Sequence, residues 1–221
     1  MPLSYRVPPL EPRGFLNEVA YNTFQLTFRL VLRWFFHLSL ADVKPEPSEG
    51  RLIIAANHCS YLDPLVLGAA FERRVFYIMQ GRYYDMPALN WFFRTSRCIC
   101  VDSEKDNRQA LRESKRVLDG DEVLGIFPEG HISPDGSMQE GQGGMAWLAR
   151  KTGARVLPVH IGGTRRALTR GKKFLSPSRV TVRSGALMSI DDYPDTREGH
   201  EAFTRDVMAA IAALGAARPT R

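Results

Sequence analysis

A histidine and an aspartate stand close together directly after an apolar run of the chain. The run is Leu52-Ile53-Ile54-Ala55-Ala56, and His58 and Asp63 follow it with four residues between them. These residue types suit a general-base pair, in which a carboxylate fixes the tautomer of an imidazole and stabilises its protonated form. The spacing also suits an aspartate that caps a helix beside an unrelated histidine, and the residues alone leave both interpretations open.

The local structure around the pair decides whether the two side chains can meet. On one regular helix, five residues turn through roughly 500°, which would place His58 and Asp63 on different faces. Pro64 favours another arrangement, because proline suits the first turn of a helix. We therefore predict a strand that ends near His58, then a loop, then a helix with Asp63 as its N-cap. The loop can then fold the carboxylate back onto the ring.

A second apolar run, residues 123–127, leads into another polar turn. The turn reads Pro-Glu-Gly-His-Ile-Ser over residues 128–133. A Pro-Glu-Gly turn alone is typical of a surface loop. Active sites of α/β sheets, however, gather beyond the ends of the strands. Two strands that both end in polar residues therefore predict one shared site.

Short apolar runs alternate with helical patterns along most of the chain, which favours an α/β fold. With 221 residues, the chain fits one domain that has a central, mostly parallel sheet flanked by helices. Strands are predicted at 52–56, 75–79, 98–101, 123–127, 155–161 and 179–185, and helices at 64–71, 87–94, 106–119, 142–152 and 200–214.

Residues 15–40 are strongly apolar but carry one narrow polar stripe. Its members recur every three or four residues: Glu18, Asn22, Gln25, Arg29, Arg33 and His37. This spacing predicts one long or broken amphipathic helix. Two mid-helix arginines make a membrane span costly, so we expect the helix to lie in a membrane surface, with the arginines toward the head groups. The alternative is a helix packed on its own core. We divide the chain into a membrane-association segment, 1–45, and a catalytic domain, 46–221.

Charge is unevenly distributed. The chain carries 30 Lys and Arg against 24 Asp and Glu, and no acidic residue lies between Glu140 and Asp191. Such a one-sided field suits anionic partners, which are the head groups of an anionic lipid surface, phosphorylated substrates or nucleic acid. The alternative is a solvated basic face without a partner. Nucleic acid is a poor candidate, because the aromatic residues cluster in 15–40 and not within the basic interval. The three cysteines, at 59, 98 and 100, show no metal-binding spacing and fit a reducing compartment. We expect neither a metal nor a cofactor.

The motifs in this order resemble the glycerolipid acyltransferase family, which includes 1-acylglycerol-3-phosphate acyltransferases. The resemblance covers residues 50–190 and rests on Asn-His-x-x-x-x-Asp at 57–63, Phe-Pro-Glu-Gly about 65 residues later, and Val-Leu-Pro-Val at 156–159. It implies that His58 is the base and Asp63 its orienting carboxylate. It also implies transfer of an acyl group from acyl-CoA or acyl carrier protein to a lysophospholipid, at the cytoplasmic face of a membrane, by a peripheral or monotopic enzyme. Cys59, next to the base, would point away from it on an extended chain.

The resemblance also suggests a set of acceptor-binding residues. These are Phe127, Pro128, Glu129 and Gly130, together with the cations Arg165 and Arg166. Many family members have Thr and Arg after Pro-Glu-Gly and a further Arg in the motif between, whereas here His131 and Ile132 follow and residues 100–103 read Cys-Val-Asp-Ser. Either other cations replace these arginines, with Arg94, Arg97 and Lys105 as further candidates, or the acceptor is a lysolipid with a larger head group. A non-enzymatic lipid-binding or lipid-transfer protein is the remaining alternative.

Overall fold

A computed structural model describes residues 15–80, 98–101, 107–168 and 175–217. In chain order, the elements are α1 (Phe15–Phe35), β1 (Ser39–Asp42), β2 (Leu52–Ala56), α2 (Asp63–Ala70), β3 (Val75–Gln80), β4 (Ile99–Val101), α5 (Asn107–Asp119), β5 (Val123–Ile126), α6 (Gly144–Thr152), β6 (Arg155–Gly162), α7 (Thr164–Ala167), β7 (Thr181–Ser184), the 3-10 turn η1 (Ile190–Asp192) and α8 (Arg197–Ala216).

The strands form one sheet in the order β1-β7-β6-β2-β5-β3-β4. Neighbouring strands from β6 to β4 are parallel to one another. β7 is antiparallel to β6, and β1 is parallel to β7. The predicted mostly parallel α/β sheet is confirmed, and each predicted strand corresponds to a strand of this sheet.

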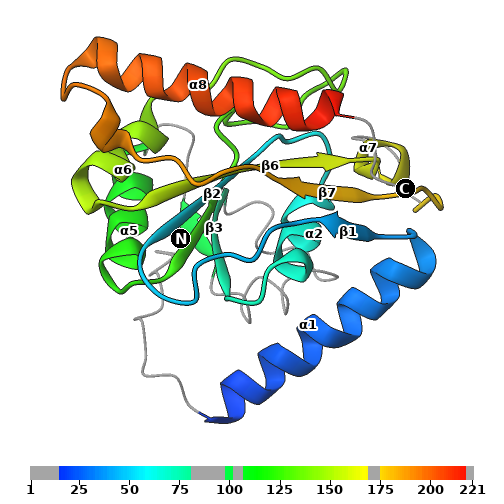
Figure 1. The fold of residues 1–221 in the computed structure, drawn as a ribbon. Coiled ribbons are helices and arrows are strands. Elements are labelled where there is room, and N and C mark those ends of the chain that lie inside the picture. Colours follow the sequence, from blue (N-terminus) through cyan, green and yellow to red (C-terminus); the bar gives the residue numbers. More distant parts are fainter. Residues whose placement is uncertain (1–14, 81–97, 102–106, 169–174, 218–221) are drawn as a thin grey trace, which may run out of the picture.

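Helices cover both faces of the sheet, which produces three layers (Figure 1). One core contains residues of α1, α2 and α7, and the other contains residues of α5, α6 and α8. The central strand β2 shows why both cores form: Leu52, Ile54 and Ala56 enter the first, while Ile53 and Ala55 enter the second. Successive side chains of a strand point to opposite faces, so a continuous apolar run fits a strand that is covered on both sides.

The helix expected over residues 15–40 is shorter than predicted. α1 ends at Phe35, His37 takes a positive φ of 44°, and residues 39–42 form the edge strand β1. The prediction is wrong for these residues, because the Leu38 and Ser39 amides bond to Leu32 and Val180 and turn the chain into the sheet. A boundary at residue 45 therefore divides the sheet, since β1 lies before it. The predicted helix at 87–94 lies outside the described residues.

Two members of the polar stripe of α1, Gln25 and Arg29, face the protein. Gln25 donates to the carbonyls of Gly68 and Phe71, at 2.8 and 2.6 Å, and the Arg29 guanidinium donates to the Ala69 carbonyl at 2.7 Å. These are the last carbonyls of α2, which lack partners within their own helix and attract positive charge. The expectation that Arg29 faces lipid head groups is therefore wrong. Within the described residues, no helix has the length and apolarity to span a bilayer.

Candidate active site

Three neighbouring parallel strands end at one edge of the sheet and supply the site. β2 leads to His58, β5 leads to Glu129, and β6 leads to Thr164, which starts α7. Because these strands run in the same direction in the order β6-β2-β5, their carboxyl ends are adjacent. This is the edge at which open α/β sheets bind substrates.

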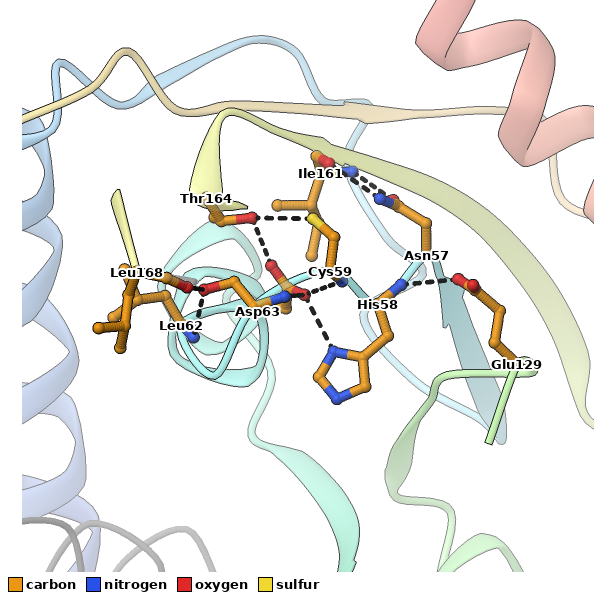
Figure 2. A network of polar contacts seen from close by, with 10 residues as sticks. Asn57, His58, Cys59, Leu62, Asp63, Glu129, Ile161, Thr164 and Leu168 are labelled. Atoms are coloured by element: carbon orange, nitrogen blue, oxygen red, sulfur yellow. Dashed lines mark hydrogen bonds and ion pairs between the residues drawn. The ribbon is translucent and has the colours of Figure 1, made fainter. Parts of the chain in front are cut away.

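His58 and Asp63 are in contact. Asp63 Oδ2 lies 2.9 Å from His58 Nδ1, with the Asp63 side chain completely buried and that of His58 16 % exposed. An ionised carboxylate only accepts hydrogen bonds, so Nδ1 carries the proton and Nε2 has the free lone pair of a base. Figure 2 shows this second edge of the ring turned away from the polar network. The predicted contact is present.

The Asp63 carboxylate accepts three further hydrogen bonds, two from the loop before it and one from α7. Oδ2 also accepts from the backbone amides of Cys59 at 2.7 Å and Ser60 at 2.8 Å, and Oδ1 accepts from the Thr164 hydroxyl at 2.6 Å. A buried charge is tolerated when it is paired and fully hydrogen-bonded, as this one is. The N-cap prediction is wrong by one position: Leu62 is the cap and Asp63 is the first helical residue. The Asp63 carboxylate does not cap the helix but accepts hydrogen bonds from the amides of the preceding loop.

Glu129 holds the backbone of the base. The Glu129 side chain is buried, and it accepts from the His58 amide at 2.8 Å and from the Gln139 amide at 2.9 Å. The His58 carbonyl in turn accepts from the Ser133 amide at 2.8 Å. Both backbone polar groups of His58 are therefore fixed by residues 129–133. This geometry makes Glu129 a positioning residue for the base.

The rest of the Phe-Pro-Glu-Gly turn also shapes the surroundings of His58. The Phe127 ring stacks on the imidazole, with 4.0 Å between centroids and 17° between planes. The Pro128 carbonyl accepts from the Gln142 amide at 2.8 Å. Gly130 has a φ of +74°, and a Cβ there would collide with the Gln142 side chain. The turn thus needs glycine at this position.

Two residues contribute to the site in ways that were not predicted from the sequence: Asn57, which was quoted only as part of a motif, and Thr164, which was not named. The Asn57 side chain pairs with both backbone groups of Ile161, at 3.0 and 2.8 Å, and so extends the contact between β2 and β6 past the strand end. Thr164 reaches Asp63 from 101 residues away in the chain. One local signal was available: Gly163 has a φ of +87°, and a Cβ there would overlap the Arg179 carbonyl. The glycine pair 162–163 at the end of β6 marks this turn, but it does not indicate which side chain Thr164 contacts.

The two cations predicted to bind the acceptor differ in their contacts. Arg165 and Arg166 are both exposed on α7. The Arg165 guanidinium donates to the Pro134 carbonyl at 3.3 Å, and its stem lies against Gly136. Arg165 thus contacts the loop that carries Ile132. The other candidates, Arg94, Arg97 and Lys105, lie outside the described residues.

Cys59 is not suited to nucleophilic attack. Burial, with Asp63 nearby, raises the pKa of its thiol to about 11. The thiol is therefore neutral near pH 7, and the thiolate is the nucleophilic form. Among the described residues, no group of three or more His, Cys, Asp or Glu side chains could hold a metal ion.

Comparisons with known proteins agree with this architecture. The solved structure of the 1-acyl-sn-glycerophosphate (LPA) acyltransferase PlsC from Thermotoga maritima matches with a TM-score of 0.73 and 23 % identity, over 98 % of this chain and 88 % of that one. A 1-acyl-sn-glycerol-3-phosphate acyltransferase of Limnanthes douglasii is 23 % identical over 199 residues, which are 82 % of this chain and 68 % of that protein. A 1-acyl-sn-glycerol-3-phosphate acyltransferase of Borreliella burgdorferi is 25 % identical over 146 residues, which are 65 % of this chain and 58 % of that protein.

The family model described as Acyltransferase matches residues 39–162, which is more than half of the chain. The match begins at β1, runs through the His58 and Glu129 turns and ends at the last residue of β6. The chain therefore belongs to the Acyltransferase family and is an acyltransferase.

Proposed function

We propose that this enzyme transfers a fatty acyl group from a thioester, acyl-CoA or acyl carrier protein, to the free hydroxyl of 1-acylglycerol-3-phosphate, which gives phosphatidic acid. The observation that carries the proposal is the His58–Asp63 pair, with Nδ1 held by a buried carboxylate and Nε2 on the open side. An alcohol is a weak nucleophile near pH 7 and needs such a base, whereas a thioester is already activated.

Each bond change has a place in this geometry. His58 Nε2 takes the proton of the acceptor hydroxyl while the hydroxyl oxygen attacks the thioester carbonyl carbon. The C–S bond then breaks, and the leaving thiolate takes the proton back from the imidazolium. Asp63 stabilises the positive ring during the step, and Phe127 and Glu129 keep the ring and its backbone in place.

The acceptor is proposed from the names of the relatives and from the basic character of α7. A phosphomonoester carries nearly two negative charges near pH 7, and arginine binds such groups through its planar fork. Arg165 supports this assignment, because its guanidinium contacts the loop that carries Ile132, the position that the family pattern gives to arginine. Ile132 itself is the observation that favours the second candidate, a lysolipid with a larger head group, since an aliphatic side chain offers neither charge nor hydrogen bond.

We further propose that α1 rests on the cytoplasmic face of a membrane through the side opposite its packing face. Val19, Leu26, Leu30, Val31 and Trp34 are all exposed, with Trp34 82 % exposed. An exposed apolar face beside positive charge is typical of interfacial helices. The exposed Arg33 supplies that charge. Gln25 and Arg29 of the polar stripe face α2, so these two side chains point away from the head groups that the sequence suggested for the stripe.

The test is thiol release from palmitoyl-CoA, dependent on an added lysolipid in mixed micelles, with the product identified by mass spectrometry. We expect phosphatidic acid from 1-oleoyl-glycerol-3-phosphate at a higher kcat/KM than any product from lysophosphatidylethanolamine or lysophosphatidylcholine. The same panel with palmitoyl acyl carrier protein identifies the donor. Release that does not depend on any lysolipid would contradict the proposal.

A further inference from the structure

The His58–Asp63 pair is connected to a second pair of buried side chains, Thr164 and Cys59. The Thr164 hydroxyl lies 2.6 Å from Asp63 Oδ1 and 3.3 Å from the Cys59 sulfur, and all three side chains are buried (Figure 2). Thr164 belongs to α7, Cys59 to the loop after β2, and Asp63 to α2. Three separate segments therefore meet behind the imidazole.

The direction of these hydrogen bonds follows from the number of protons. An ionised carboxylate only accepts, so the single Thr164 proton goes to Asp63. The Thr164 oxygen then has lone pairs but no proton for Cys59, so the Cys59 thiol is the donor. Its raised pKa, about 11, keeps that proton on the sulfur near neutral pH. The order is fixed: Cys59 to Thr164, Thr164 to Asp63, and His58 Nδ1–H to Asp63 from the other side.

The two carboxylate oxygens have different roles. Oδ2 accepts from His58 and from two backbone amides, while Oδ1 accepts from Thr164. Thr164 therefore controls rotation about the Cβ–Cγ bond of Asp63, on which the direction of Oδ2 toward the ring depends. α7 is itself fastened to the same loop, because the Ser60 hydroxyl donates to the Leu168 carbonyl at 2.6 Å.

We propose that Thr164 is a positioning residue for the general base, acting through Asp63, with Cys59 fixing the orientation of its hydroxyl. The proposal rests on the proposed function, in which His58 is the base. Because Thr164 is completely buried behind Asp63, it acts on the rate of proton transfer and not on substrate binding.

The test compares Thr164→Val, Thr164→Ala and Thr164→Ser with a matched control. Thr152 is also a buried threonine, at the end of α6 just before β6 begins, and its hydroxyl donates to the Leu148 carbonyl at 2.7 Å. Thr152→Val therefore removes a buried hydroxyl away from the site. We expect Thr164→Val to lower kcat about tenfold with KM nearly unchanged, since bonds to charged groups are the stronger ones. Thr164→Ser should restore most of kcat, and Thr152→Val should leave it unchanged. If valine at this position disturbs folding, Thr164→Ala replaces Thr164→Val as the test variant.

A second measurement needs no substrate. In the enzyme labelled with ¹⁵N-histidine, the Nδ1–H proton of His58, assigned by its absence in His58→Ala, should be sharp in the wild type and in Thr164→Ser. It should be broadened or lost in Thr164→Val. A folded Thr164→Val or Thr164→Ala enzyme with wild-type kcat and an unchanged Nδ1–H signal would overturn the proposal, as would an equal loss in Thr152→Val. A wild type that acylates no lysolipid would contradict the proposed function alone, because the signal still tests the role of Thr164.

Discussion

The two edges of the parallel strands hold different kinds of polar structure. At the carboxyl edge, buried carboxylates of Asp63 and Glu129 are aimed at one imidazole and its backbone. At the amino edge, a recess of about 720 Å³ is lined by residues that precede β2, β3 and β5, among them Glu49, Glu72 and Asp121. This recess is therefore not where the base lies.

Side chains at the amino edge connect loops to one another. Arg73 donates to the carbonyls of Pro47 and Asp121, and Arg51 donates to the Thr152 carbonyl at 2.6 Å and to Asp121 at 3.3 Å. Such exposed bonds contribute modestly to stability. The comparison indicates that an edge is prepared for catalysis by a buried carboxylate whose oxygens are all hydrogen-bonded, and that a recess alone does not do this.

Removal of the base is the strongest test of this contrast between the two edges. His58→Ala should lower kcat about 10²–10⁴-fold, because a positioned general base typically contributes that much. Arg51→Ala, at the amino edge, is the matched control and should keep kcat within about twofold, because distant sites act independently. Near-normal turnover by folded His58→Ala enzyme would end the assignment of His58 as base.

Asp63→Asn should be nearly as damaging to activity and more damaging to the fold. The Asp63 carboxylate accepts from four donors, whereas an amide offers one oxygen and places an NH₂ group against further donors. We expect a loss of about 3–5 kcal/mol in the free energy of unfolding, measured by urea denaturation. Unchanged stability would mean that the Asp63 carboxylate does not accept all four of these hydrogen bonds.

Glu129→Gln tests the role of the second carboxylate as a support. Glutamine keeps one acceptor, so either the His58 or the Gln139 amide faces an NH₂ group. We expect kcat to fall about tenfold and stability to fall by about 1–3 kcal/mol. Glu140→Gln, an exposed neighbour in the same loop, is the control. A change in KM alone would instead assign Glu129 to the acceptor.

Much of the sheet could be predicted from the sequence, because a strand buried on both sides reads as a short apolar run. β2 follows its predicted limits, 52–56, for this reason. β1 was missed because its four residues continue the apolar pattern of α1 and lie at the edge of the sheet. Short edge strands contribute too few apolar residues to give a pattern of their own.

The site was predictable where its partners are near in sequence. His58 and Asp63 are five residues apart, and a strand–loop–helix junction lets them meet. Thr164 was not predictable, because its contact with Asp63 depends on β6 and β2 being neighbours in the sheet. The stripe of α1 was misread for a related reason: Gln25 and Arg29 have the same spacing whether they face head groups or the carbonyls of another helix.

The two faces of α1 give a further comparison with a measurable consequence. Replacing Leu26 and Trp34 by serine removes exposed apolar area without touching the contacts of Gln25 and Arg29. We expect partitioning onto anionic liposomes to weaken about tenfold or more, given the apolar area that each side chain would bury. Leu175→Ser, an exposed leucine outside α1, is the control. Equal sedimentation of the double variant and the wild type would place the membrane contact elsewhere.

The smallest expected effect concerns the acceptor and separates the two arginines of α7. Arg165 contacts the loop of Ile132 through the Pro134 carbonyl and Gly136, so we expect its guanidinium, and not that of Arg166, to compensate for the missing family arginine. We expect Arg165→Ala to raise KM for 1-oleoyl-glycerol-3-phosphate about fivefold, because one charge-assisted pair is lost. KM for lysophosphatidylcholine should stay nearly unchanged. Arg166→Ala is the matched control, with the same charge change on the next residue.

Ile132→Arg in the Arg165→Ala background completes this test of acceptor choice. If both positions serve one phosphate, the new arginine should restore the preference for 1-oleoyl-glycerol-3-phosphate, because either guanidinium can supply the positive fork. The quantity to compare is the ratio of kcat/KM for the two acceptors across the wild type, Arg165→Ala, Arg166→Ala and the double variant. An unchanged ratio in all four would show that this loop does not face the acceptor. A wild-type preference for lysophosphatidylcholine would instead favour the larger head group, with Ile132 as the reason.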